Sequence, residues 1–155
     1  QQKRKKTKVM SCVALILVST LMPKFGRTSK RRLETCDEDL IDLFNEVIKY
    51  FDCTILEGHR GKELQNKYYN EGKSKVKYPR GKHNADPSTA VDVVPYPVDW
   101  EDTDRMYYFA GFVKGMAASM EINIRWGGDW DNDTEVKDTG FKDLPHYELL
   151  LFSNE

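Results

Sequence analysis

The chain has 155 residues, the length of one ordinary domain. Hydrophobic residues make up 39%, aromatic residues 12% and charged residues 32%, which excludes a disordered or collagen-like chain. The net charge of −1 is uneven, because residues 1–35 carry +9 and residues 36–155 carry −10. An acidic body argues against nucleic-acid binding, and the basic arm is typical of a solvated tail. Three cysteines without a C-x-x-C motif predict neither a disulfide framework nor a thiolate metal site.

The first 21 residues differ from the rest of the chain. A cluster of Lys and Arg at 3–8 precedes an uncharged, mostly apolar run at 9–22, which is shorter than the ~20 residues of a membrane span. This layout is typical of an export or anchoring segment. The alternatives are upstream sequence read in frame, since the chain begins with Gln and Met22 suits a natural start, and a packed core helix. We therefore place the domain at 22–155 and expect membrane contact only through 1–21.

The remaining sequence predicts alternating helices and strands. Apolar residues at helical spacing follow Asp37 as far as Phe51 and predict an N-capped helix. Further helices are expected at 61–71 and from Thr103 or Asp104 to about Met120, and polar loops at 72–90 and 128–142. Short β-branched or alternating runs predict strands at 53–57, 91–95, 122–126 and 146–151. Helices outside a small antiparallel sheet make an α+β domain.

Two of the three histidines and one aspartate suggest a metal site. His83 lies in the long loop, Asp92 lies inside an apolar strand, and His146 begins the last strand. A carboxylate in such a strand must be paired or bound to a metal, because burying it bare is costly. Each residue alone has an ordinary structural explanation, but together they form a ligand set for zinc. Three protein ligands leave a position for water, as catalytic zinc sites do.

Two further carboxylates accompany His146. Asp143 lies three residues before it, and Pro145 stiffens the link between them. A carboxylate beside a metal ligand can accept a proton from water and donate it to a leaving amine, so Asp143 is the predicted catalytic base. Glu148 shares a strand face with His146 and is predicted to orient that ligand; it is also the reserve candidate for the base.

Several segments together carry a recognisable pattern. These are Gly81–Asn84, Pro87–Pro97, Arg125–Trp130 and Asp143–Leu149, with an opening stretch at 25–33. The pattern resembles the zinc peptidases of the D-alanyl-D-alanine carboxypeptidase (VanY) type, and most of all the phage endolysins that cut the L-alanyl-D-glutamate bond of peptidoglycan. The resemblance covers about residues 22–150. It implies a Hedgehog/DD-peptidase-like fold, zinc as the cofactor and bacterial peptidoglycan as the partner.

The resemblance also implies roles for individual residues. It matches the zinc ligands to His83, Asp92 and His146, and the base to Asp143. Arg60 matches an arginine near the substrate carbonyl, where a guanidinium can stabilise an oxyanion. Gln65 lies where the family often has Gln, so we expect a substrate hydrogen bond from it. Trp126 and Trp130 are predicted to be walls of the substrate cleft, although an aromatic residue beside Gly-Gly is as often core.

Two positions depart from the family pattern. Gly81 stands where a serine is common, two residues before the first histidine ligand, and this removes a hydrogen bond near the metal. His59 stands where relatives carry a hydrophobic or aromatic residue. We interpret His59 as a partly buried residue at a strand end rather than as a fourth ligand.

The sequence leaves three functions open. The leading hypothesis is an endolysin-like L-alanyl-D-glutamate endopeptidase that acts as a monomer on the bacterial cell wall or periplasm, after synthesis in the host cytoplasm if phage-encoded. The second is a D-alanyl-D-alanine carboxypeptidase or dipeptidase with the same metal. The third is a non-catalytic zinc module of the Hedgehog kind, which Asp143 disfavours because a binding module needs no base.

Overall fold

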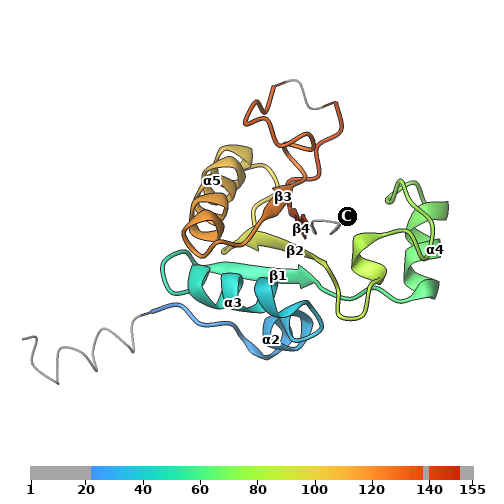
Figure 1. Cartoon of the computed structure of the whole chain (residues 1–155), viewed down its shortest axis with the longest axis horizontal. Helices are drawn as coiled ribbons and strands as arrows, with labels where there is room; N and C mark the ends of the chain where they lie inside the picture. The colour runs from blue at the N-terminus through green and yellow to red at the C-terminus, as the bar shows by residue number, and fades with distance from the viewer. Residues whose placement is uncertain (1–21, 138–139, 151–155) are drawn as a thin grey trace, which may run out of the picture.

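The computed structural model in Figure 1 describes residues 22–137 and 140–150. The expectations for residues 1–21 lie outside this range. The elements in chain order are α2 (Arg27–Leu33), α3 (Glu38–Val47), β1 (Cys53–Glu57), α4 (Lys62–Asn70), the short 3-10 helix η1 (Lys82–Asn84), β2 (Ala90–Pro95), α5 (Thr103–Ser119), β3 (Ile124–Trp126) and β4 (His146–Leu149). The strands form one antiparallel sheet in the order β1-β2-β4-β3. This arrangement confirms the predicted α+β class.

The predicted helices form with small changes at their ends. The Asp37 side chain caps α3 by accepting a hydrogen bond from the Asp39 backbone at 3.1 Å. The helix ends at Val47 rather than Phe51, because tighter i→i+3 turns follow: the amides of Lys49 and Tyr50 each donate to the carbonyl three residues earlier. The first strand residue of β3 is Ile124 rather than the predicted 122, and β4 ends at Leu149.

The short helix α2 was not predicted from the sequence. It buries only Ser29 and Leu33, so it lacks the apolar period that marks an amphipathic helix. Two contacts hold it against β1: the Ser29 hydroxyl accepts from the Ile55 amide at 3.2 Å, and Arg32 donates to the Ile55 carbonyl at 2.9 Å. These bonds use backbone groups that an edge strand otherwise leaves open.

The core lies on one face of the sheet, against α3 and α5. Alternate strand residues point into it, among them Val91, Val93 and Tyr147, each at most 1% exposed. The Tyr147 ring makes edge contacts with Phe44 of α3 at 5.6 Å and with Phe109 of α5 at 6.2 Å between centroids. Helix α4 lies apart from this core, beyond the end of β1 (Figure 1). None of the helices within 22–137 and 140–150 is both long and apolar enough for a membrane span.

Candidate active site

The opposite face of the sheet lines a cleft of about 1190 Å³. The same alternation that sends Val91 and Tyr147 to the core turns Asp92 and His146 toward this cleft. Strand pairing places these two residues directly opposite one another, since Asp92 of β2 is the register partner of His146 of β4. The cleft therefore receives its polar groups from neighbouring strands at matching positions.

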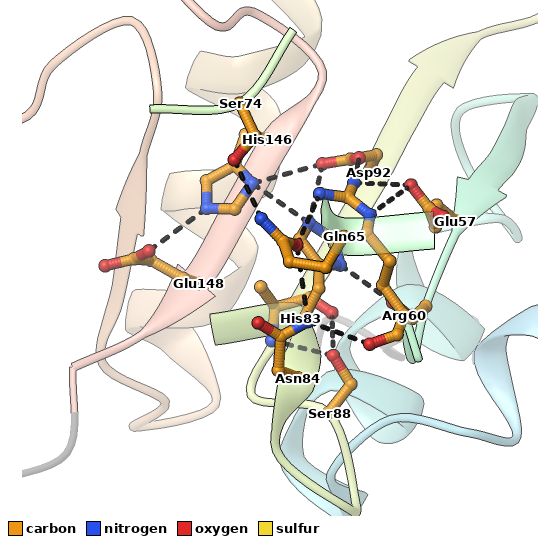
Figure 2. A network of polar contacts seen from close by, with 12 residues as sticks. Glu57, Arg60, Gln65, Ser74, His83, Asn84, Ser88, Asp92, His146 and Glu148 are labelled. Carbon is orange, nitrogen blue, oxygen red and sulfur yellow. Dashed lines mark hydrogen bonds and ion pairs between the residues drawn. The ribbon is translucent and has the colours of Figure 1, made fainter. Parts of the chain in front are cut away.

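The structure brings His83, Asp92 and His146 together, although they are far apart in the sequence (Figure 2). The Nε2 atom of His83 lies 3.1 Å from Oδ1 of Asp92 and 3.2 Å from Nδ1 of His146. The Nδ1 atom of His146 lies 3.1 Å from the same carboxylate oxygen. The one-turn helix η1 presents His83 to the strands, and both histidines are buried. These three residues are a group that could hold a metal ion.

The outer nitrogen of each imidazole has a fixed partner. The Nδ1 of His83 lies 2.7 Å from the Gly58 carbonyl, which can only accept, so this nitrogen carries the proton. The Nε2 of His146 lies 3.0 Å from Oε2 of Glu148. An ionised carboxylate can only accept, so Nε2 of His146 also carries a proton. In the neutral rings the lone pairs of the other nitrogens then face Asp92. Two imidazole lone pairs and a carboxylate directed at one point fit the ligand preference of zinc.

The charges in this group depend on one another. Burial opposes ionisation of Asp92, but the two imidazoles hold the pKa of its carboxyl well below the usual range. Burial also opposes protonation of His146, yet hydrogen bonds to Asp92 and Glu148 raise its pKa to about 9. In the absence of a metal, His146 is therefore an imidazolium near neutral pH. A metal ion would replace this proton as the positive charge between the ligands.

Asp143, the predicted base, also lines the cleft. Its backbone amide donates to the Gly127 carbonyl at 2.8 Å, and its carbonyl accepts from the His146 amide at 3.0 Å. The chains are so close here that a Cβ on Gly127 would lie 2.2 Å from the Asp143 carbonyl oxygen, which accounts for glycine at this position. Burial and, after it, the negative charge of Asp92 raise the pKa of the Asp143 carboxyl. A raised pKa suits a group that accepts and returns a proton.

Glu148 lies where it can orient His146, the first of its two predicted roles. Besides its contact with His146, its carboxylate accepts from Nε of Arg125 at 3.1 Å. Burial raises the pKa of Glu148, but His146 and Arg125 outweigh it and lower the pKa overall. With both oxygens engaged, Glu148 is less suited than Asp143 to act as the base.

Arg60 lies on the other side of the ligands, in a hydrogen-bonded network (Figure 2). Its Nε donates to Glu57 at 3.0 Å, and Nη2 lies 3.5 Å from Oδ2 of Asp92. Glu57 was not predicted from the sequence to be part of the site, although its position three residues before Arg60 was a usable signal. The Nη1 of Arg60 donates to Oε1 of Gln65 at 3.2 Å. The guanidinium is buried and immobilised, yet it still lines the cleft.

Gln65 lines the cleft, but its side chain is hydrogen-bonded within the protein. Its side chain is 1% exposed, and both of its polar atoms are already used. Oε1 accepts from Arg60 and, at 3.2 Å, from Asn84, while Nε2 donates to Ser74 at 2.9 Å and to the Val76 carbonyl at 2.6 Å. Gln65 thus positions Arg60 and the following loop, and has no group free for a substrate.

Trp126 was predicted to line the cleft, but the structure places it in the core. It is 3% exposed and belongs to the core, where its ring contacts Tyr107 at 5.4 Å and its Nε1 donates to the Leu144 carbonyl at 2.7 Å. Trp130 does line the cleft, with its ring 5.5 Å from that of His146, and stacks on Phe141 at 6.4 Å. Trp130 and Phe141 therefore form an aromatic part of the cleft wall.

The two departures from the family pattern have structural counterparts. A Cβ at Gly81 would lie 2.8 Å from Oδ1 of Asn84, because the Asn84 side chain fills this space and accepts from the Gly81 amide at 3.0 Å. Asn84 also donates to the Arg60 carbonyl at 2.8 Å. His59 is exposed, rather than partly buried as expected, and is not part of the metal-binding group.

A second acidic group, Asp129, Asp131 and Asp133, has carboxylates close enough to bind a cation. The cation at this group is the side chain of Lys114. The ammonium of Lys114 lies 2.9 Å from Asp129 and 2.8 Å from Oδ1 of Asn132. Asp129 also accepts from the Asp133 amide at 3.1 Å. These contacts stabilise the loop after β3 against α5.

The fold and the cleft define a class of protein: an α+β domain with a two-histidine, one-aspartate group and an adjacent carboxylate, a layout typical of metal-assisted hydrolysis. The family model of phage L-alanyl-D-glutamate peptidases matches residues 21–150, so the chain belongs to this family. This result confirms the resemblance inferred from the sequence.

A solved structure supports the same assignment. The L-Ala D-Glu endopeptidase ChiX of Serratia marcescens is 27% identical in sequence and superposes with a TM-score of 0.66. The match covers 84% of this chain and 92% of that one. No match was found among curated protein sequences. The fold and the family thus agree over nearly the whole domain.

Proposed function

We propose that the chain is a zinc metallopeptidase that hydrolyses the L-alanyl-D-glutamate bond in the stem peptide of bacterial peptidoglycan. The observation that carries this proposal is the convergence of His83, Asp92 and His146 in a cleft that also contains Asp143. Membership in a family of phage L-alanyl-D-glutamate peptidases supports the choice of bond. So does the likeness to an endopeptidase of the same specificity.

His83, Asp92 and His146 would hold the ion, and when bound it supplies Lewis acidity that polarises a carbonyl and acidifies water. Asp143, whose raised pKa keeps its proton affinity above that of an ordinary carboxylate, accepts the proton of the attacking water. Asp143 then donates that proton to the amine that leaves. Glu148 keeps the His146 ring in orientation through Nε2.

Arg60 has the charge and rigidity to stabilise the oxyanion that develops on the scissile carbonyl. Its donors are held by Glu57 and Gln65, so little reorganisation is needed during the reaction. Four of its five N–H bonds are accounted for by its contacts with Glu57, Gln65 and Asp92. One N–H on Nη1 is left to contact a substrate.

The test is a digest of purified peptidoglycan with the zinc-loaded full chain, followed by mass spectrometry of the new termini. We expect new N-terminal D-glutamate, or its amidated form, and little free D-alanine. Free D-alanine as the main product would favour the carboxypeptidase alternative. Tight binding to peptidoglycan without any new terminus would favour the non-catalytic zinc module. The Asp143→Asn variant is the matched control, because it keeps the fold and the ligands but lacks the base.

A further inference from the structure

One side of the cleft carries an unusual concentration of positive charge. Residues 72–82, which follow α4 and end with the first residue of η1, contain five Lys or Arg and no acidic residue. Four of these line the cleft, and we name them the basic wall: Lys73, Lys75, Arg80 and Lys82. The cleft as a whole is lined by eight Lys or Arg and four Asp or Glu. This is the reverse of the balance over residues 36–155, which sum to −10.

The acidic groups of the cleft do not neutralise this wall. Glu57 is paired with Arg60, Glu148 with Arg125, and Asp92 belongs to the metal-binding group. The fourth acidic residue of the cleft, Asp143, is the proposed base. Within residues 22–137 and 140–150, Lys75, Arg80 and Lys82 form no ion pair, whereas Lys73 is 2.7 Å from Glu71. The three unpaired cations are exposed to the solvent of the cleft. They are available to an anionic ligand.

The backbone of the segment that carries the basic wall is anchored near the metal-binding group. Gln65, on α4, holds its first part through the hydrogen bonds to Ser74 and the Val76 carbonyl. Its last part leads into η1, so that Lys82 directly precedes the ligand His83.

A chain of ring contacts links the wall to the metal-binding group from the other side. The ammonium of Lys75 lies 5.4 Å from the centre of the Phe141 ring, which stacks on Trp130, and Trp130 contacts His146. Lys75 therefore lies in the same cleft as the metal-binding group and is connected to His146 through three successive contacts.

The stem peptide bears its negative charges on one side of the bond that the proposed function cleaves. The alanine on the amino side is joined to the sugar through an uncharged amide. The D-glutamate on the other side continues through its γ-carboxyl, so its α-carboxylate is free, and a following diamino diacid adds a second carboxylate. Many cell walls carry amides at these carboxyls, which removes the charge.

We propose that the basic wall binds the carboxylates on the leaving side of the substrate, so that the enzyme selects stem peptides with free carboxylates over amidated ones. This inference rests on the proposed function and adds to it the chemical form of the substrate. Lys75, Arg80 and Lys82 act as specificity determinants through charge-assisted hydrogen bonds. The same wall orients the stem, with its C-terminal part toward residues 73–82.

The test compares two synthetic stem peptides, N-acyl-L-Ala-γ-D-Glu-diaminopimelate and its counterpart amidated at the α-carboxyl of D-glutamate. The zinc-loaded full chain is assayed with both, and kcat/KM is obtained from the new N-terminus. We expect the free acid to be cleaved about tenfold more efficiently. In the triple variant Lys75→Gln, Arg80→Gln, Lys82→Gln this preference should fall to about one. Added salt should lower kcat/KM more for the free acid than for the amide.

A second triple variant, Lys49→Gln, Lys62→Gln, Lys137→Gln, changes the net charge equally at residues that do not line the cleft. It should keep the wild-type preference. If the wild-type chain cleaves both peptides equally at the L-alanyl-D-glutamate bond, the inference is overturned while the proposed function stands. A preference that persists in the cleft triple variant overturns the role of the wall. Failure to cut that bond in either peptide refutes the proposed function itself.

Discussion

The two faces of the sheet are built from the same strands but differ in burial and polarity. On β4, Tyr147 and Leu149 point into the core, while His146 and Glu148, their neighbours in sequence, face the cleft. On β2, Val91 and Val93 likewise point into the core, while Asp92 between them faces the cleft. One face is apolar and covered by helices, and the other carries charged groups linked by hydrogen bonds. The core strands are thus also the scaffold of the site.

This comparison shows how the core sets the geometry of the chemistry. Side chains alternate with a period of two, so a one-residue slip of β4 would exchange His146 for Tyr147 at the cleft. The apolar residues on the covered face resist such a slip, because it would expose them to water. The pairing of Asp92 with His146 therefore depends on residues that never contact a ligand.

The largest effect is expected from loss of a ligand on the cleft face. His83→Ala or His146→Ala should weaken zinc binding by more than about 100-fold, because each removes one of three protein donors. Activity should be lost together with the metal, and removal of zinc from the wild-type chain by a chelator should have the same effect, reversed by added zinc. Elemental analysis of the purified variants is the measurement. Full zinc occupancy in a variant would exclude the replaced histidine from the ligands.

The next effect separates metal binding from proton transfer. Asp143→Asn is nearly isosteric but cannot accept a proton, so turnover should fall by about 10²-fold or more while zinc remains bound. Turnover and zinc content are measured on the same sample. Glu148→Gln is the companion variant, and it should reduce activity less. Near-normal turnover in Asp143→Asn together with an inactive Glu148→Gln would reverse the two assignments.

The protonation of His146 makes zinc binding depend on pH. Without metal, the pKa of His146 is about 9, so the ring carries a proton below that pH, and zinc must displace it. The apparent affinity should therefore rise roughly tenfold per pH unit as the pH approaches 9, and then level off. Competition with a chelator at several pH values measures this. An affinity independent of pH between 7 and 8.5 would show that His146 is neutral in the metal-free protein.

Most of the residues that the structure gathers in the cleft could be identified from the sequence, because each carries a local signal. The buried carboxylate in an apolar strand, the D-x-x-H spacing of Asp143 and His146, and strand alternation at Glu148 were all readable without coordinates. Trp126 could have been predicted correctly, since the alternation that places Arg125 outside places Trp126 in the core. Helix α2 could not, because it is held by hydrogen bonds to β1 rather than by an apolar stripe.

The hydrogen bonds of Gln65 within the protein could not be predicted from the sequence. Its partners come from three segments, at Arg60, Ser74–Val76 and Asn84, and their convergence is a property of the tertiary structure. A glutamine in a sequence has the same appearance whether it faces a substrate or satisfies its neighbours. The basic wall was partly readable, because its four charges all lie within residues 73–82 of the sequence. The lack of acidic partners at Lys75, Arg80 and Lys82 was not readable, because it is a property of the tertiary structure.

The smallest effect is expected on the covered face, one residue from the ligands. The Tyr147 hydroxyl is buried and finds no hydrogen-bond partner among the described residues, and burial raises its pKa well above the ordinary value. Removing an unsatisfied buried polar group relieves its desolvation penalty, so Tyr147→Phe should stabilise the protein by about 1 kcal/mol. Zinc affinity and kcat should not change, because the ring and its contacts with Phe44 and Phe109 remain. Denaturant unfolding at matched zinc content measures the difference. A loss of stability would show that the hydroxyl has a partner, such as a buried water, and a change in kcat would show that the two faces are coupled through β4.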